Sequence, residues 1–252
     1  MTLNQDIAES ANKPLNEFKS IFDQIRNYDS YKYISLHDIL IQSNINDENI
    51  IYAWGEFIKK SKSISTSIIY SLVEKNNSRM LELFLDNHRV SISSGNLHLI
   101  RMMSGLSILN IILSKTSHIS DNGYSHDLLY ELLKVDIALA ELFIIKSNIE
   151  FDIRENIYIH KKPQNLLILC IRDDNLDGLT LLSKYFKIEF NKNDIDRLNI
   201  FMNDMNDCLK YIIDYSLFDD QFLEYIDKHD LLLFRKIREY MASKCRAKSA
   251  RS

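Results

Sequence analysis

Thr66-Ser-Ile-Ile-Tyr-Ser-Leu-Val-Glu-Lys-Asn-Asn-Ser-Arg-Met-Leu-Glu-Leu-Phe-Leu85 decides the predicted fold, because its design recurs at Gln164-Asn-Leu-Leu-Ile-Leu-Cys-Ile-Arg-Asp-Asp-Asn-Leu-Asp-Gly-Leu-Thr-Leu-Leu-Ser183. In both copies an apolar stretch, a short polar break and a second apolar stretch follow one another, which is typical of two short antiparallel helices. Ser67 and Asn165 hold matching places 98 positions apart, close to three units of about 33 residues, a period of helical solenoids. We therefore predict an all-α chain of stacked antiparallel helical hairpins, an α-solenoid.

The composition supports helices over sheets. Only 5 Gly and 2 Pro occur among 252 residues, which leaves few residues suited to tight hairpins and bulges. The 35 Ile favour strands by intrinsic propensity, but most recur at the three-to-four spacing of a helix face. Together with 22 Asn, they are typical of a protein encoded in an AT-rich genome.

The charge and the cysteines narrow the class of protein. A net charge of -4 from 31 basic and 35 acidic residues argues against a general nucleic-acid binder, and no specific nucleic-acid partner is predicted. Cys170, Cys208 and Cys245 are odd in number and widely spaced, so we expect a reducing compartment, the cytoplasm or the cytoplasm of a host cell, and no disulfide framework. Residues 1–11 lack the apolar core of an export signal, and no apolar stretch is long enough to predict a transmembrane segment.

Four regions are predicted along the chain. Residues 1–62 form an N-terminal helical segment, in which 1–11 are loose and Asn12 with Pro14 opens the first helix. Residues 63–215 hold the helical repeats, 216–242 are capping helices, and 243–252 are a basic flexible tail. The stretch from Thr116 to Ser125 is predicted to be a loop around Asp121, Asn122 and Gly123. Trp54 lies on an apolar helical stripe and is predicted to be core.

The repeat region resembles a degenerate ankyrin-repeat protein. Met80-Leu-Glu-Leu-Phe-Leu-Asp-Asn-His88 is similar to the outer helix of an ankyrin repeat, and 69–73 takes the place of the inner one. Further outer-helix matches lie at 139–147, 179–185 and 208–215. The Thr-Pro-Leu-His opening of the family is replaced by Ser67-Ile-Ile-Tyr70 and Asn165-Leu-Leu-Ile168. Asn76 and Asp174 stand where the family has glycine between the helices, and both types tolerate left-handed backbone.

Catalytic and metal-binding patterns are weak. The five glycines are isolated from one another, so no phosphate loop and no cofactor is predicted. His118 and His126 with Asp127 could hold a metal, but loop histidines are more often solvent-exposed, and no metal site is predicted. The neighbours His37 and Asp38 point to different faces of a helix, which disfavours an acid–base pair. Cys170 lies in an apolar stretch and is interpreted as core.

The resemblance implies a protein–protein interaction module whose partner is another protein. Intracellular pathogens and large DNA viruses use divergent repeats of this kind to seize host proteins, and the AT-rich composition agrees with a virulence or effector role. The expected contact surface comprises inter-repeat loops and inner helices. Its residues are Ser65, Thr66, His118, Asp121, Asn122, Tyr124, His160, Lys161 and Lys162.

Three alternatives stay open at this point. One is a helical effector enzyme that modifies a host protein and hides its polar site in a groove, which a deep pocket with converging His, Asp or Glu side chains would favour. Another is an inhibitor or immunity protein that acts by surface occlusion. The basic tail, with Lys244, Arg246, Lys248 and Arg251, is predicted to be solvated, and contact with a polyanion is the alternative for it.

Overall fold

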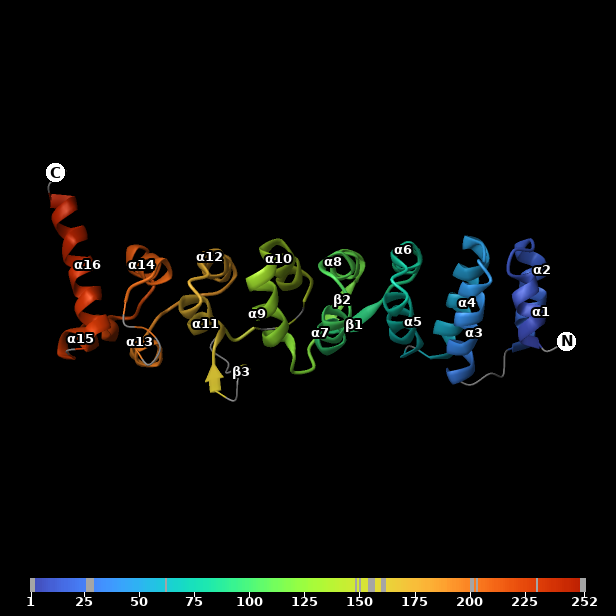
Figure 1. The fold of residues 1–252 in the computed structure, drawn as a ribbon, viewed down its shortest axis with the longest axis horizontal. Coiled ribbons are helices and arrows are strands. Elements are labelled where there is room, and N and C mark those ends of the chain that lie inside the picture. The colour runs from blue at the N-terminus through green and yellow to red at the C-terminus, as the bar shows by residue number, and fades with distance from the viewer. Residues whose placement is uncertain are drawn as a thin grey trace. The chain divides into compact units, whose positions relative to one another are not determined.

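The computed structural model describes residues 3–25, 30–61, 63–147, 149, 151–153, 157–159, 162–199, 202, 204–229 and 231–249. Over this part of the chain the protein is mostly helical, with sixteen α-helices and four strands of three residues each (Figure 1). The chain divides into two compact units, residues 1–125 with 142–149 and residues 126–141 with 150–252. The predicted helical class is confirmed.

The first unit is built from helix pairs. Its elements are α1 (Leu3–Ser10), α2 (Leu15–Phe22), a 3-10 turn (Asp23–Ile25), α3 (Ser30–Gln42), α4 (Asp47–Lys60), α5 (Ser63–Glu74), α6 (Ser78–Asn87), β1 (Ser91–Ser93), α7 (Ser94–Met103), α8 (Leu106–Lys115) and β2 (His118–Ser120). The first helix of each pair packs on the first helix of the next pair, as in α3 on α5 and α5 on α7. The second helices do the same, as in α4 on α6 and α6 on α8.

The second unit holds the rest of the helices. Its elements are α9 (Ser125–Val135), β3 (Ile157–Ile159), β4 (Lys162–Gln164), α11 (Leu166–Arg172), α12 (Leu176–Tyr185), α13 (Lys192–Asn199), α14 (Asp207–Asp214), α15 (Asp220–Lys228) and α16 (Leu232–Ser249). The division of the chain falls within α10 (Ile137–Lys146). Here α11 contacts α12 and α13, α12 contacts α14, and α15 contacts α16. The strands β3 and β4 form an antiparallel pair.

The two copies of the repeated pattern share their backbone geometry. Asn76 and Asp174 both have left-handed backbone, with φ of 49° and 51°, as predicted from their residue types. The next residue in each copy donates its backbone N–H five positions back, Asn77 to the Leu72 carbonyl at 2.9 Å and Asn175 to the Cys170 carbonyl at 2.8 Å. The side chains of Asn77 and Asn175 then cap the second helix of the pair.

The same kind of turn also occurs outside the predicted repeats. Asn44, between α3 and α4, and Ser216, after α14, have φ of 51° and 53°. Asn46 then caps α4 by accepting from the backbone N–H of Asn49 at 2.9 Å. Within the predicted N-terminal segment, the α3–α4 pair is therefore joined by the same kind of turn as the α5–α6 pair.

The apolar residues that the helical spacing placed inside are buried. Trp54 is fully buried, as predicted, and its ring meets Phe84 edge-on with 5.1 Å between the ring centroids. Cys170 is likewise buried, and burial raises the pKa of its thiol to about 12. A thiol with that pKa stays protonated at neutral pH, as the interpretation of Cys170 as core requires.

Both predicted loose ends are corrected. Residues 3–10 form α1, because Ile7 and Ala11 are apolar enough to bury against the unit. Pro14 caps α2 without a side-chain hydrogen bond, so Asn12 is not the cap. The predicted flexible tail is helical as far as Ser249, and Lys244 donates to a carboxylate oxygen of Asp214 at 2.8 Å, which ties α16 to the end of α14. Residues 250–252 lie outside the described part.

The predicted loop at 116–125 contains a strand. Ile119 on β2 lies opposite Ile92 on β1 in a parallel pair, and both side chains are buried. Ile119 also bridges to Ser147, and a similar parallel bridge joins Phe190 to Phe218. These pairings join segments about one helix pair apart in the sequence, so local residue patterns do not reveal them. Across the described residues, no helix combines the length and apolarity that crossing a membrane requires.

Candidate interaction site

The segment Asp121–Tyr124 is held against the start of α7 by polar contacts. The Asn122 side-chain oxygen accepts from the Gly95 backbone N–H at 2.6 Å and from the Ser94 hydroxyl at 2.8 Å. A Cβ at position 95 would lie 2.5 Å from the Asn122 side-chain nitrogen, so glycine is required for this approach. The contacts fix the segment to the first turn of the helix.

Asp121 organises the turn itself. Its carboxylate accepts from the Ser125 hydroxyl and, at 2.9 Å, from the Gly123 backbone N–H. The Ser125 bond and the other hydrogen bonds to the carboxylate hold the pKa of Asp121 below its usual value, although burial opposes them. Gly123 has φ of 88°, a conformation that residues with a Cβ rarely adopt. Asp121 is thus a charged structural residue of the turn at neutral pH.

Tyr124 follows the turn and stacks on His98 of α7. The two ring centroids are 5.7 Å apart, and the ring planes are inclined by 22°. Tyr124 keeps 49% of its surface exposed. The stacking extends the surface of α7 with an aromatic side chain whose position is set by the turn.

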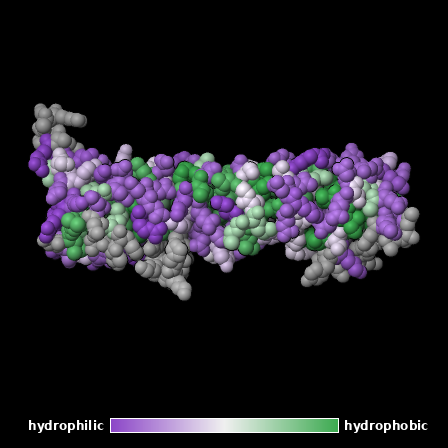
Figure 2. Space-filling view, viewed as in Figure 1, coloured by the Kyte–Doolittle hydropathy of each residue, from purple (hydrophilic) through white to green (hydrophobic). Residues whose placement is uncertain are grey.

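Large apolar side chains of α7 also face solvent. Leu99, Met102 and Met103 are 50%, 70% and 48% exposed. Residues three and four apart on a helix are neighbours, so these three side chains and His98 form one surface. We call His98, Leu99, Met102, Met103 and Tyr124 the α7 face. In Figure 2, hydrophobic atoms reach the surface over α7.

The exposed apolar residues of α7 were missed in the sequence. Leu97 and Ile100 bury the opposite side of the helix, so α7 is apolar on two sides. In the sequence, His98-Leu-Ile-Arg-Met-Met103 is an apolar stretch of the kind that forms one helix of a pair. The available signal was that its apolar residues fill more than the single stripe that one core contact needs.

The predicted contact residues fall into separate groups. Asp121, Asn122 and Tyr124 are exposed and belong to the turn, and His118 on β2 is half-buried. Ser65 and Thr66 lie on α5, which packs beside α7, but Ser65 is 9% exposed and offers little contact surface. His160 and Lys161 lie outside the described residues. Lys162 begins β4 in the second unit, and its side chain lies outside the described part.

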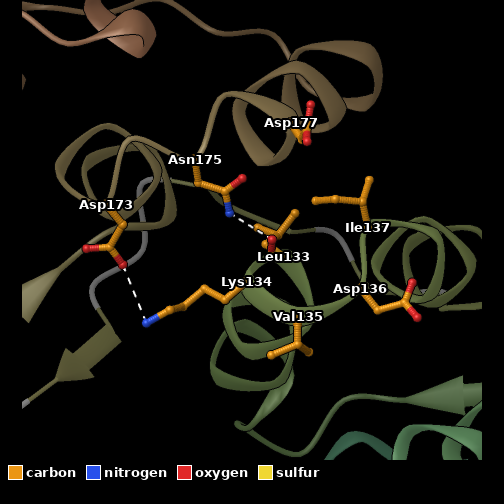
Figure 3. Close-up of a pocket in the computed structure, with 8 residues that line it drawn as sticks. All are labelled: Leu133, Lys134, Val135, Asp136, Ile137, Asp173, Asn175 and Asp177. Atoms are coloured by element: carbon orange, nitrogen blue, oxygen red, sulfur yellow. Dashed lines mark hydrogen bonds and ion pairs between the residues drawn. The ribbon is translucent and has the colours of Figure 1, made fainter.

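The second unit has a pocket of about 330 Å³ (Figure 3). It is lined by the end of α9, the start of α10 and the turn from α11 to α12, through Leu133, Lys134, Val135, Asp136, Ile137, Asp173, Asn175 and Asp177. Asn175 donates its side-chain amide to the Leu133 carbonyl at 2.7 Å, and Asp136 accepts from the Leu139 backbone N–H at 3.0 Å as the cap of α10. These contacts complete the ends of helices.

Asp173 is the most strongly bound carboxylate of the pocket. It accepts from the Tyr130 hydroxyl and from Arg172 Nε, both at 2.7 Å, and its charge lies 3.6 Å from Lys134 Nζ. Burial raises the pKa of Asp173, but the bonds from Arg172 and Tyr130 and the neighbouring positive charges outweigh burial and leave the pKa below its usual value. Burial and Asp173 raise the pKa of Tyr130. The cluster joins α9 to the α11–α12 turn and is fully explained by that structural role.

No family model, no curated protein and no solved structure matches this chain. Among the described residues, no group of three or more His, Cys, Asp and Glu side chains is placed to hold a metal ion. The α7 face and the pocket in the second unit are therefore the two candidate sites that the structure offers.

Proposed function

We propose that this chain is a protein–protein interaction module built from ankyrin-like helical pairs, and that the α7 face and the Asp121–Tyr124 turn contact its partner. The single observation that supports this function most is the exposure of Leu99, Met102 and Met103 on one helix face. Contiguous exposed apolar side chains are costly in water and mark interaction surfaces. Methionine and tyrosine are also enriched in such surfaces.

The repeat architecture supports the same proposal. Helix pairs in the first unit contact the pairs next to them in sequence order, and the turns between helices repeat their capping geometry. Arrays of this kind are scaffolds that present a continuous surface to another macromolecule. The polar contacts of Asn122 with Ser94 and Gly95 keep the turn in place before binding, which lowers the ordering entropy that a contact surface loses.

The alternative of an effector enzyme has less support. The pocket in the second unit does bring carboxylates together, but Asp173 is engaged by Arg172 and Tyr130, and Asp136 caps α10. Neither arrangement leaves a general acid or base with a shifted pKa directed at a substrate position. We therefore rank the interaction module above the enzyme.

Site-specific photo-crosslinking tests the proposed surface. A photoreactive amino acid replaces Met102 in the intact chain, which is then irradiated in a eukaryotic cell lysate. The control carries the same group in place of Asn110, an exposed polar residue of α8 in the same unit. We expect discrete crosslinked proteins with the probe at position 102 and only background at position 110. Equal crosslinking at both positions would reject the α7 face as the contact surface.

A further inference from the structure

Arg101 is a cation on α7 for which the described residues provide no hydrogen bond and no ion pair. It is half-buried, and its Nε is shielded from solvent without a hydrogen-bond acceptor among the described residues. No ion pair with another described residue involves its guanidinium. Buried donors in folded proteins nearly always have an acceptor. The outer nitrogens of the guanidinium are not among the shielded atoms, so a carboxylate from outside the chain can pair with them.

The position of Arg101 links it to the α7 face. It follows His98 by three residues, so the two side chains are neighbours on the helix, and His98 is in turn a neighbour of Met102, four residues further on. The helix from Ser94 to Met103 contains no Asp or Glu. The Asp121 carboxylate, which contacts the first turn of α7, already accepts bonds from Ser125, Gly123 and Ser94. The cation therefore borders the α7 face at His98, on a helix that has no acid of its own.

We infer that the occupant of the α7 face is an acidic, apolar segment of a partner protein, in which one carboxylate pairs with Arg101 while large apolar side chains cover Leu99, Met102 and Met103. This inference rests on the proposed function and adds the chemistry of the partner. A carboxylate matches the fork of N–H donors of a guanidinium, and charge-assisted bonds of this kind are about twice as strong as neutral ones. Methionine side chains adapt to varied apolar shapes, so the carboxylate supplies the specificity.

A peptide selection with the full chain tests the inference. A displayed library of random peptides of about twelve residues is selected on the immobilised protein and depleted on the Met102→Asp variant. We expect the enriched peptides to combine large apolar residues with Asp or Glu. Their affinity, measured by fluorescence anisotropy, falls about tenfold or more for Arg101→Glu and for Met102→Asp.

Two controls separate charge from folding. Arg89→Glu changes an exposed arginine of the same unit by the same charge, and we expect peptide affinity to remain within about twofold of the wild type. Arg101→Gln removes the charge and keeps most of the aliphatic stem, so it replaces Arg101→Glu in the binding assay if Arg101→Glu loses its helical circular dichroism. A peptide in which the acid is replaced by Lys should bind Arg101→Glu better than it binds the wild type.

Each other outcome overturns a defined part of the argument. Peptides that need Met102 but tolerate Arg101→Glu, or that are basic, reject the acidic occupant and leave the proposed function standing. Peptides that bind equally to Met102→Asp reject the α7 face itself. Failure to enrich any peptide rejects a short segment as the occupant, and self-association that Met102→Asp abolishes in sedimentation equilibrium identifies a second copy of the chain instead.

Discussion

His37 shows how a single buried residue makes the stability of this fold depend on pH. The Trp54 indole N–H donates to His37 Nδ1 at 3.1 Å, which places the imidazole proton on Nε2, an atom without a partner among the described residues. Burial lowers the pKa of His37 to about 4, with Lys75 acting in the same direction and Asp38 opposing it. The folded chain therefore holds a neutral imidazole.

The sign of the effect follows from proton binding. Between about pH 6.5 and pH 4 the unfolded chain protonates His37 and the folded chain does not, so acid favours unfolding. We expect His37 to lower the free energy of unfolding by about 2 kcal/mol between pH 7 and pH 5. His37→Gln should lose this part of the pH dependence when urea unfolding is compared at the two pH values.

A neighbouring variant provides the control. Asp38→Asn should keep the pH dependence of the wild type between pH 7 and pH 5, because the Asp38 charge raises the pKa of His37 and its own pKa lies below that window. If His37→Gln and the wild type lose the same free energy of unfolding from pH 7 to pH 5, the buried imidazole is not the cause.

At the scale of elements, asparagine caps distinguish the two copies of the repeated pattern. Asn77 accepts one bond, from the Met80 backbone N–H at 3.2 Å. Asn175 accepts from the Gly178 backbone N–H at 2.8 Å and also donates to the Leu133 carbonyl on α9. Asn175 thus makes one more hydrogen bond than Asn77, and this bond joins its helix pair to α9.

This difference predicts unequal costs of substitution. Asn77→Ala should lower the free energy of unfolding by about 1 kcal/mol and Asn175→Ala by about 2 kcal/mol, as measured by urea denaturation. Asn175→Asp keeps the capping acceptor and loses the donor, so it should fall between the wild type and Asn175→Ala. Equal losses for the two alanine variants would mean that the bond to Leu133 contributes nothing to stability.

The features of the elements that could be predicted are those that depend on short stretches of sequence. The left-handed turns at Asn76 and Asp174 depend on residue type and near neighbours, and so do the buried stripes around Trp54 and Cys170. The strand β2 depends on β1, which lies about one helix pair away in the sequence, and α1 depends on burial of Ile7 in its unit. Such contacts are decided by tertiary packing, which outweighs local propensity.

The candidate site was predictable only where it depends on local sequence. Asp121, Asn122 and Tyr124 belong to a polar, glycine-containing stretch of the kind that forms turns. The α7 face was not predictable, because Leu99 and Met102 look like core residues until the packing of Leu97 and Ile100 shows which side of the helix is covered. The identity of an apolar residue does not reveal whether its side chain is exposed or buried.

At the scale of the whole molecule, each unit has its own set of internal contacts and its own buried aromatic residues. Phe84 is fully buried in the first unit, and Phe190 is fully buried in the second. Helices mainly contact helices that are one or two helices away along the chain. For the array of helix pairs that we propose, stability is a sum of local terms, so the loss of one core residue destabilises mainly the neighbouring helices. A single two-state transition is not the expected behaviour of such a chain.

This organisation predicts a regional response to core substitutions. Phe84→Ala should cost about 3–5 kcal/mol in its own surroundings and speed amide hydrogen exchange across α4 to α8, with little change across α11 to α15. Phe190→Ala should give the reverse pattern, and mass spectrometry of peptic fragments measures both. Comparing the two variants excludes global destabilisation as the cause, because global destabilisation would speed exchange in all helices alike. A uniform increase in both variants would mean that the chain unfolds as one cooperative body, because the contacts within each unit would then not set the size of the unfolding segment.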